Sequence, residues 1–232
     1  MLEQLLHYER NAFFLLNGSD SIYLDHFMWL FSTKSVWLPL AVFILIVLCY
    51  KKNWKEVLFI LISIALVTTL CDQFASHFCK PFFARFRPTS HPDFMNEVQT
   101  VFGYRSGRYG FISSHAANAF GFAIYLSMVF RNRFFAFTVF FWSAFTAYTR
   151  VYLGVHFISD VVFGAIAGLI YGFAVFHLYK FARKKILGGN PIPPSEIYTS
   201  KSVNMISYAI WISIALILIL NYPLVEFIRL YF

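Results

Sequence analysis

The chain has 232 residues, of which 59% are hydrophobic and only 13% are charged. Soluble domains carry about 25% charged residues, so the composition excludes an ordinary soluble enzyme and indicates an integral membrane protein with one domain. The net charge of +8 does not indicate nucleic-acid binding, because the cations lie between apolar stretches, where they act as topology signals or site residues.

The three cysteines are odd in number and lack metal-ligand spacing, so we interpret them as apolar core thiols. The N-terminal residues lack a basic segment followed by a short apolar core and a small-residue cleavage site. The sequence therefore predicts no cleaved signal peptide.

Residues 1–35 are amphipathic rather than uniformly apolar. Leucines and phenylalanines recur at helical spacing as far as Leu16, and the turn signal Asn17–Asp20 precedes a second amphipathic stretch, Ile22–Thr33. We expect this N-terminal region to form two short interfacial helices at the membrane surface. The alternative is a first membrane span beginning at Ile22.

The remainder, 36–232, alternates apolar stretches with polar connectors. The apolar stretches are 36–50, 57–79, 111–130, 134–148, 157–179 and 203–222. This pattern predicts an all-α polytopic bundle of about six transmembrane helices. Pro81 is expected to end the second span, and the glycine- and proline-rich stretch 188–194 is expected to be a turn. The polar segment 80–110 is long for a connector, which favours a functional role.

Three basic connectors should lie on the cytoplasmic side of the membrane. They follow the first, third and fifth spans, around Lys51, Arg131 and Arg183. The long loop 80–110 and the turn Arg150–His156 then face the opposite side together. We therefore expect a multi-pass membrane protein with its site on the extracytoplasmic face, and we place it in a bacterial cytoplasmic membrane as a separate expectation.

His156 and Asp160 form the first candidate pair for chemistry. They are four residues apart at the start of an apolar stretch, so helical backbone would place both side chains on one face. A carboxylate at a membrane-helix end is costly and usually functional. Aspartate holding one imidazole nitrogen would leave the other free as a nucleophile. The alternative is a buried pair that only satisfies itself.

Two further segments carry cations and hydrogen-bond donors on the same side. Lys80 and Arg87 flank a proline-bounded stretch, and Ser113–His115 begins the third span. A helix N-terminus with free N–H groups binds anions. With Arg150, these groups suit a phosphoryl group whose charge is stabilised during transfer. The alternatives are lysine and arginine snorkelling at the interface and simple helix capping.

Two histidines suit a nucleophile and an acid in such a transfer. The sequence has no Asp/Glu-rich cluster for a divalent cation, which favours chemistry without metal or other cofactor.

Three motifs now coincide in order. Lys80–Pro88 fits the pattern K-x6-R-P, Ser113–His115 resembles P-S-G-H, and Thr149–Asp160 resembles S-R-x5-H-x3-D. Together they resemble the type 2 phosphatidic acid phosphatase (PAP2) superfamily, which also contains vanadium haloperoxidases. The matched motifs lie within 80–160, so we expect a PAP2-like phosphatase domain over 36–232.

The resemblance implies roles for the matched residues. His156 would be the nucleophile that forms a phosphohistidine, Asp160 would orient it, and His115 would protonate the leaving oxygen. The phosphate would be bound by Lys80, Arg87, Arg150 and the backbone amides of Ser113 and Ser114.

Three positions depart from the motifs, because Ile112, Ser114 and Thr149 replace the family proline, glycine and serine. Either the Ser114 hydroxyl joins the phosphate bonds or the pocket is slightly shifted.

Gly164, Gly168 and Gly172 continue the line of His156 and Asp160 at steps of four residues. A small-residue stripe of this kind allows close helix packing. We therefore expect the site to lie inside the bundle, against a neighbouring helix.

The resemblance implies a phosphorylated lipid substrate among membrane lipids, with no nucleic acid and no obligate protein partner. Candidate substrates are undecaprenyl diphosphate and lipid A phosphate, which we favour, and phosphatidylglycerol phosphate or phosphatidic acid. Arg105 and Arg108 in the loop would suit a headgroup with a second phosphate and are predicted to determine selectivity. A transporter that uses the intramembrane charges and a haloperoxidase-like relative are the alternatives.

Overall fold

The computed structural model describes residues 2–187 and 193–231, and the regular structure in these ranges is helical. The longer helices are α1 (Leu2–Leu16), α2 (Ile22–Ser32), α3 (Leu38–Cys49), α4 (Trp54–Asp72), α6 (Ser114–Phe130), α7 (Arg133–Tyr152), α8 (Ile158–Leu187), α10 (Ser200–Ile219) and α11 (Asn221–Tyr231). The short elements are η1 (Lys34–Trp37), η2 (Gln73–Cys79), α5 (Lys80–Phe83), η3 (Pro88–Ser90), η4 (Val101–Gly103) and α9 (Pro194–Ile197). Most of the predicted turn 188–194 lies outside the described residues.

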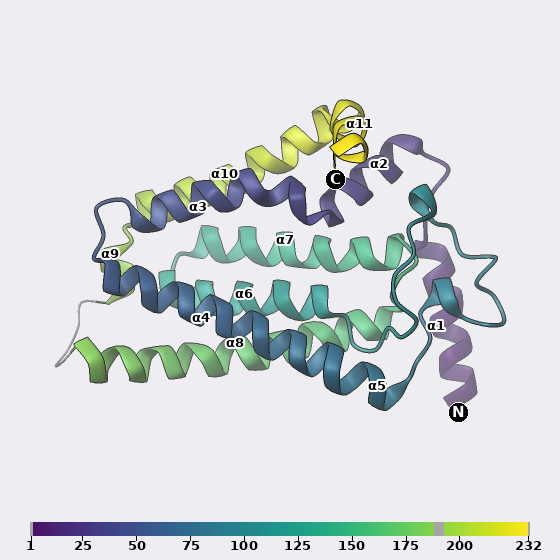
Figure 1. The fold of residues 1–232 in the computed structure, drawn as a ribbon, viewed down its shortest axis with the longest axis horizontal. Coiled ribbons are helices and arrows are strands. Elements are labelled where there is room, and N and C mark those ends of the chain that lie inside the picture. Colours follow the sequence, from purple (N-terminus) through teal and green to yellow (C-terminus); the bar gives the residue numbers. More distant parts are fainter. Residues whose placement is uncertain (1, 188–192, 232) are drawn as a thin grey trace.

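The prediction of an all-α membrane bundle is confirmed. Helices α3, α4, α6, α7, α8 and α10 run side by side along the long axis (Figure 1). Three described helical segments are long and apolar enough to cross a membrane by themselves, namely 54–83, 158–186 and 200–219. The pair formed by Ile22–Ser32 and Lys34–Cys49 passes the same test as one span bent by 69°. The predicted number of six spans is not established by these criteria.

The bent pair changes the interpretation of residues 22–50. The helix breaks at Thr33, whose hydroxyl donates to the Trp29 carbonyl at 2.8 Å. Across the break, the indole N–H of Trp37 donates to the carbonyl of Phe31 at 2.8 Å. Ile22–Ser32 therefore continues into α3 as a broken span or re-entrant segment, whereas α1 lies across the end of the bundle, roughly perpendicular to it (Figure 1).

The prediction that Pro81 ends the second span is wrong. One helical segment runs from Trp54 to Phe83, and a π-helical turn, Gln73–Cys79, comes directly before the proline. A π turn loosens the regular hydrogen-bond ladder, so it accommodates a residue that cannot donate. The helix ends instead at Ala84, which is left-handed with φ 44°.

The small-residue stripe on α8 packs against α6, as expected. A Cβ atom added to Gly168 would lie 2.1 Å from the carbonyl oxygen of Ala117, and one on Gly172 would lie 2.4 Å from that of Gly121. Gly164 is equally close to α6, with 2.5 Å to the Ser113 carbonyl oxygen. Because a side chain at these positions would push the two helices apart, the stripe brings the start of α8 against the start of α6.

The basic connectors predicted from the sequence lie at one end of the bundle. The connectors between α3 and α4 and between α6 and α7 lie together at one end, with the C-terminal end of α8 (Figure 1). Near this end, Arg183 of α8 donates to both carboxylate oxygens of Glu56 on α4, at 2.7 and 2.6 Å. At the opposite end lie α1, α5 and the long loop after α5.

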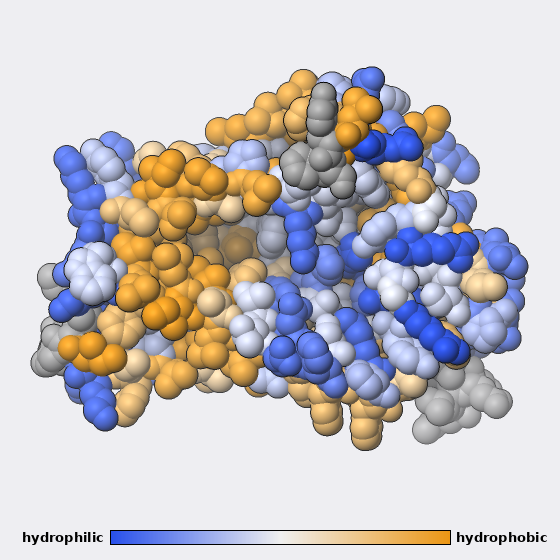
Figure 2. Space-filling view, in the orientation of Figure 1, coloured by the Kyte–Doolittle hydropathy of each residue, from blue (hydrophilic) through white to orange (hydrophobic). Residues whose placement is uncertain are grey.

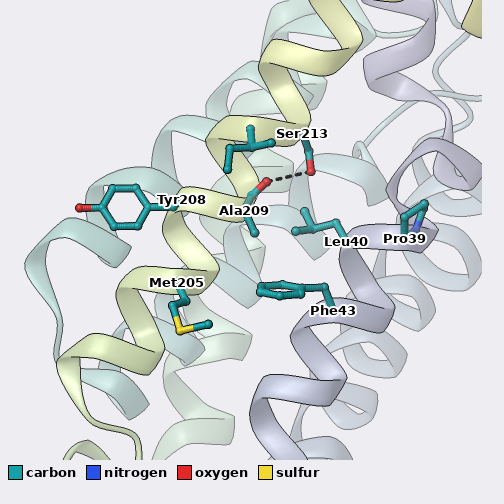
Figure 3. Close-up of a pocket in the computed structure, with 8 residues that line it drawn as sticks. Pro39, Leu40, Phe43, Met205, Tyr208, Ala209 and Ser213 are labelled. Atoms are coloured by element: carbon teal, nitrogen blue, oxygen red, sulfur yellow. Dashed lines mark hydrogen bonds between the residues drawn. The ribbon is translucent and has the colours of Figure 1, made fainter.

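The middle of the bundle presents an apolar surface, with hydrophilic residues at both ends (Figure 2). A hollow in this surface opens between α3 and α4 and holds about 450 Å³. A second, shallower groove of about 380 Å³ lies between α3 and α10. In that groove Leu40 and Phe43 face α10, and the Ser213 hydroxyl is turned to the Ala209 carbonyl at 2.8 Å (Figure 3). Apolar grooves of this kind suit lipid chains rather than water.

Candidate active site

The candidate site lies at the bundle end opposite the basic connectors. The chain from Ala84 to Ser113 folds over this end, where two of its stretches pair in an antiparallel bridge between Phe86 and Tyr109. The Arg87 amide donates to the Arg108 carbonyl at 3.0 Å, and the Gly110 amide donates to the Arg85 carbonyl at 2.9 Å. This pairing holds the Arg87 side chain over the start of α8.

His156 lies in the short turn between α7 and α8 and is 1% exposed. Its Nε2 atom is 2.8 Å from Nη1 of Arg87, and its Nδ1 atom is 3.4 Å from Oδ2 of Asp160. A guanidinium can only donate hydrogen bonds, so Nε2 carries the lone pair and the ring proton is on Nδ1, towards Asp160. Gly110 packs directly against this pair, because a Cβ atom added to it would lie 2.9 Å from Oδ2 of Asp160.

Burial and three neighbouring cations hold the pKa of His156 well below 6.5. Burial is the larger cause, followed by the charges of Arg87, Arg150 and Lys80. Burial also lowers the pKa of Arg87 to about 10, with repulsion from Arg150 as the next cause. The imidazole is therefore neutral at physiological pH, and the guanidinium keeps its charge.

Arg150 lies in the last turn of α7 and is 2% exposed. One Nη atom donates to the hydroxyl of Ser32 at the end of α2, and the other donates to the Tyr104 hydroxyl at 3.1 Å. The backbone carbonyl of Arg150 accepts the amide of His156 at 3.2 Å. Arg150 thus joins the helix break after α2, the outer loop and the turn that carries His156.

The start of α6 adds backbone N–H donors to the site. Ser113 is the N-cap residue, and its hydroxyl accepts the amide of Ala116 at 3.4 Å. The Ser113 amide donates to the Asp160 carbonyl at 2.9 Å. It is therefore not available for phosphate in this structure, contrary to the expectation that both serine amides are free. Ser114 and His115 are the first two helical residues, whose amides have no partner within the helix.

The structure brings the other predicted residues to the same end. His115 is half-buried within electrostatic range of Arg150, His156 and Arg87. Lys80 ends the long helical segment and donates to the Ser76 hydroxyl at 3.0 Å. Its ammonium is within electrostatic range of Arg87, Arg150 and Asp160.

Arg105 and Arg108 are exposed on the loop that covers the site. Arg105 donates to the Thr89 carbonyl at 2.8 Å. Arg108 lies over the rings of Phe86 and Tyr109, at 4.9 and 5.5 Å from their centroids. Neither of these contacts involves His156, and the role of both arginines in selectivity stays a prediction.

Four residues around the site were not predicted from the sequence. Arg85 and Glu9 contact the far side of Asp160 and its neighbour Ser159, and Ser32 and Tyr104 hold Arg150. Arg85 could have been noticed as an additional cation within Lys80–Pro88. Nothing in the local sequence distinguishes Glu9, Ser32 or Tyr104, because each reaches the site only through the tertiary fold.

Comparison with known proteins assigns the class. The description of the PAP2 superfamily matches residues 56–184, which contain all three motifs. The chain belongs to the PAP2 superfamily. Together with the membrane bundle, this membership makes it a membrane lipid phosphatase.

Two relatives share most of its length. A lipid A 4'-phosphatase of Porphyromonas gingivalis is 42% identical over 231 residues, covering 99% of this chain and 98% of the relative. A lipid A 4'-phosphatase of Bacteroides thetaiotaomicron is 37% identical over 198 residues, covering 83% of this chain and 86% of the relative.

Two solved structures share the fold. LpxE of Aquifex aeolicus is 28% identical with a TM-score of 0.53, covering 72% of this chain and 93% of that structure. A PAP2-type phosphatidylglycerolphosphate phosphatase from Bacillus subtilis is 22% identical with a TM-score of 0.56, covering 79% and 88%.

Proposed function

We propose that this phosphatase hydrolyses a phosphate monoester of lipid A, releasing inorganic phosphate, at the outer face of the cytoplasmic membrane. The observation that carries the proposal is the length of the similarity to a lipid A 4'-phosphatase, which extends over 99% of this chain. It includes the N-terminal helices and the C-terminal helices, which lie outside the 56–184 match to the superfamily. Among these elements, α1 contacts Ser159 through Glu9, and α2 supplies Ser32 to Arg150. Undecaprenyl diphosphate is the second candidate substrate.

In the proposed mechanism, the Nε2 lone pair of His156 attacks the phosphorus atom. Burial and the nearby cations lower the pKa of His115 to about 2, so the negative charge of a bound phosphate would have to raise it before His115 takes up a proton. A phosphorus–nitrogen bond then forms as the bond to the sugar oxygen breaks, and protonated His115 gives its proton to that oxygen. Lys80, Arg87, Arg150 and the amides at the start of α6 stabilise the charge on the transferred group. Water then attacks the phosphohistidine, loses its proton to His115, and releases inorganic phosphate.

Arg87 has to move slightly for this to happen. In this structure its Nη1 atom donates to the same Nε2 lone pair that would attack, at 2.8 Å. A phosphate oxygen is a stronger acceptor than a neutral imidazole, because the hydrogen bond is then charge-assisted on both sides. Substrate binding would therefore draw the guanidinium onto the phosphate and free the nucleophile.

The apolar hollow between α3 and α4 supports a lipid substrate. Its lining includes Trp37 and Trp142, close to the break after α2, and Leu45 and Leu61 further along the bundle. The same break supplies Ser32 to Arg150. An acyl chain in the hollow would thus lie beside a headgroup at the catalytic cations.

The proposed function is tested by phosphate release from purified protein in detergent, with EDTA present throughout. We expect lipid A to be dephosphorylated faster than undecaprenyl diphosphate or phosphatidic acid, and EDTA to have no effect. Acid-labile, base-stable phosphate should be trapped on the protein. A preference for undecaprenyl diphosphate would overturn the substrate assignment, and inhibition by EDTA would overturn the metal-free mechanism.

Arg105 and Arg108 provide a test of selectivity. We propose that they bind an anionic group of the headgroup other than the phosphate that is removed. Each charge-assisted hydrogen bond is worth about 1.5–3 kcal/mol, so Arg105→Ala with Arg108→Ala should lower kcat/KM on lipid A by about tenfold or more. Hydrolysis of phosphatidic acid should change by less than about threefold. Parallel losses on both substrates would show that the loop supports the core instead.

A further inference from the structure

The carboxylate of Asp160 is held from two sides. Its Oδ2 atom faces His156 and accepts the amide of Phe157 at 3.0 Å. Its Oδ1 atom accepts Nη1 of Arg85 at 2.8 Å. The side chain of Asp160 is 0% exposed, so Arg85 supplies the direct ionic partner of a fully buried carboxylate.

Arg85 is itself fixed by the N-terminal helix. Its Nη2 atom donates to Oε2 of Glu9 at 2.7 Å, and the other oxygen of Glu9 accepts the amide of Ser159 at 2.8 Å. Arg85 also donates to the Ser159 hydroxyl at 2.6 Å and lies 4.5 Å from the ring centroid of Phe157. The guanidinium fork therefore connects α1 to the first turn of α8 with little freedom to turn.

Glu9 is not what holds α1 in place. Phe13 of the same helix is 0% exposed and packs on Phe157 with their ring centroids 5.4 Å apart. At the end of α1, the Asn17 amide group donates to the carbonyls of Tyr152 and Gln99 at 2.8 and 3.0 Å. These contacts dock the helix independently, so the partly buried ion pair between Glu9 and Arg85 is not needed to hold α1 and can serve the site.

We propose that Glu9 and Arg85 are positioning residues that orient Asp160 and, through it, the nucleophile His156. Arg85 alone has a long flexible side chain, and a second carboxylate fixes its fork in the plane that Asp160 needs. The N-terminal helix is then part of the catalytic apparatus, although it lies outside the superfamily match. This inference rests on the proposed phosphohistidine mechanism.

The test compares Glu9→Gln with Glu97→Gln. Glu97 of the outer loop also pairs with an arginine, because its carboxylate lies 3.5 Å from Arg10 of α1. That pair is exposed and does not contact Asp160. Loss of one charge-assisted contact should lower kcat of Glu9→Gln by about tenfold or more, with KM changed by less than about twofold. Glu97→Gln should match the parent, and both variants should unfold at the parental temperature.

A double-mutant cycle identifies the route. If Glu9 acts through Arg85, Glu9→Gln should cost much less in an Arg85→Gln background than in the parent. Arg85→Lys, which keeps the charge but loses the fork, should stay close to Arg85→Gln in kcat. Equal kcat for Glu9→Gln and Glu97→Gln, fully additive losses, or a loss confined to KM would each overturn the inference.

The measurements use an aryl phosphate as well as lipid A, and inhibition by orthovanadate as a mimic of the phosphoryl group in transfer. We expect Glu9→Gln to weaken vanadate inhibition by about tenfold, because the mimic needs an aligned nucleophile. A parent that hydrolyses aryl phosphate but not lipid A would contradict the proposed function alone. Unchanged vanadate inhibition in Glu9→Gln would contradict the positioning role alone.

Discussion

At the residue scale, the two nitrogens of His156 face different partners. Nε2 faces the Arg87 guanidinium at 2.8 Å, and Nδ1 faces the Asp160 carboxylate at 3.4 Å. The donor-only guanidinium determines the tautomer. In the proposed mechanism, the carboxylate would stabilise the positive charge that develops on the ring as it attacks. The Nε2 lone pair is therefore directed at Arg87, one of the cations proposed to bind the phosphate.

His156→Ala should abolish phosphate release and phosphoenzyme formation on every substrate, because no other group takes the place of the attacking nitrogen. The control is His177→Ala, which removes an exposed histidine further along α8. Phosphate release and trapped phosphoenzyme are measured for both variants, with unfolding temperature as a check on the fold. Substantial turnover by His156→Ala would remove it from the nucleophile role.

The depressed pKa of His156 predicts a flat activity profile through mildly acidic pH. A lowered pKa keeps the nucleophile unprotonated until the pH falls through the lower value, so activity present at neutral pH is lost only there. We expect kcat/KM for an aryl phosphate to change by less than about twofold between about pH 7.5 and about pH 6. A sigmoidal loss of kcat/KM centred at about pH 6.5 would indicate a histidine with an ordinary pKa.

At the element scale, the close packing of α8 on α6 sets the distance between the two histidine-bearing segments. Asp160 at the start of α8 accepts the Ser113 amide on its backbone carbonyl at 2.9 Å. The glycine stripe further along α8 maintains that approach. The geometry of the site therefore depends on residues in the middle of the bundle, away from His156 and Asp160.

Gly168→Ala should destabilise the bundle, since its Cβ would meet the Ala117 carbonyl oxygen at 2.1 Å. Overpacking of this kind costs about 1–3 kcal/mol, which lowers the unfolding temperature by several degrees in a chain of this size. Gly107→Ala is the control, because a Cβ there has no neighbour within 4 Å. Thermal unfolding in detergent measures both, and equal unfolding temperatures would contradict the packing argument.

At the scale of the whole molecule, the position of the basic connectors indicates how the protein is oriented in the membrane. The basic connectors and the Arg183–Glu56 pair are at one end, and the site is at the other. Short loops rich in lysine and arginine stay in the cytoplasm. We therefore propose that the site faces the extracytoplasmic side.

Single cysteines would test this orientation in a background where the three native cysteines are replaced by alanine. Asp93→Cys lies in the outer loop at a side chain that is 75% exposed, and Lys184→Cys lies at the basic end of α8. A membrane-impermeant maleimide should label Asp93→Cys in spheroplasts, and Lys184→Cys only after lysis. The reverse pattern would invert the proposed topology.

The sequence by itself determined the class of fold and the core of the site. Apolar stretches of spanning length predict membrane helices, because in the hydrocarbon core every backbone N–H and C=O group must be hydrogen-bonded within the protein. The four-residue step from His156 to Asp160 and the glycine stripe beyond it depend on local spacing along one chain segment. The motif residues from Lys80 to Asp160 were expected at one end of the bundle for a different reason, because the basic connectors assign both outer segments to the same side of the membrane.

Other features were decided only by the tertiary structure. The continuation of the helix through Pro81 depends on a π turn, and the 69° break after α2 brings Ser32 to Arg150. Glu9 and Arg85 are 76 positions apart, and Arg85 and Asp160 are 75 apart. Helical periodicity relates residues three or four positions apart, whereas contacts across such separations depend on how whole helices dock. The contact between the N-terminal helix and the site therefore could not be predicted from any local sequence pattern.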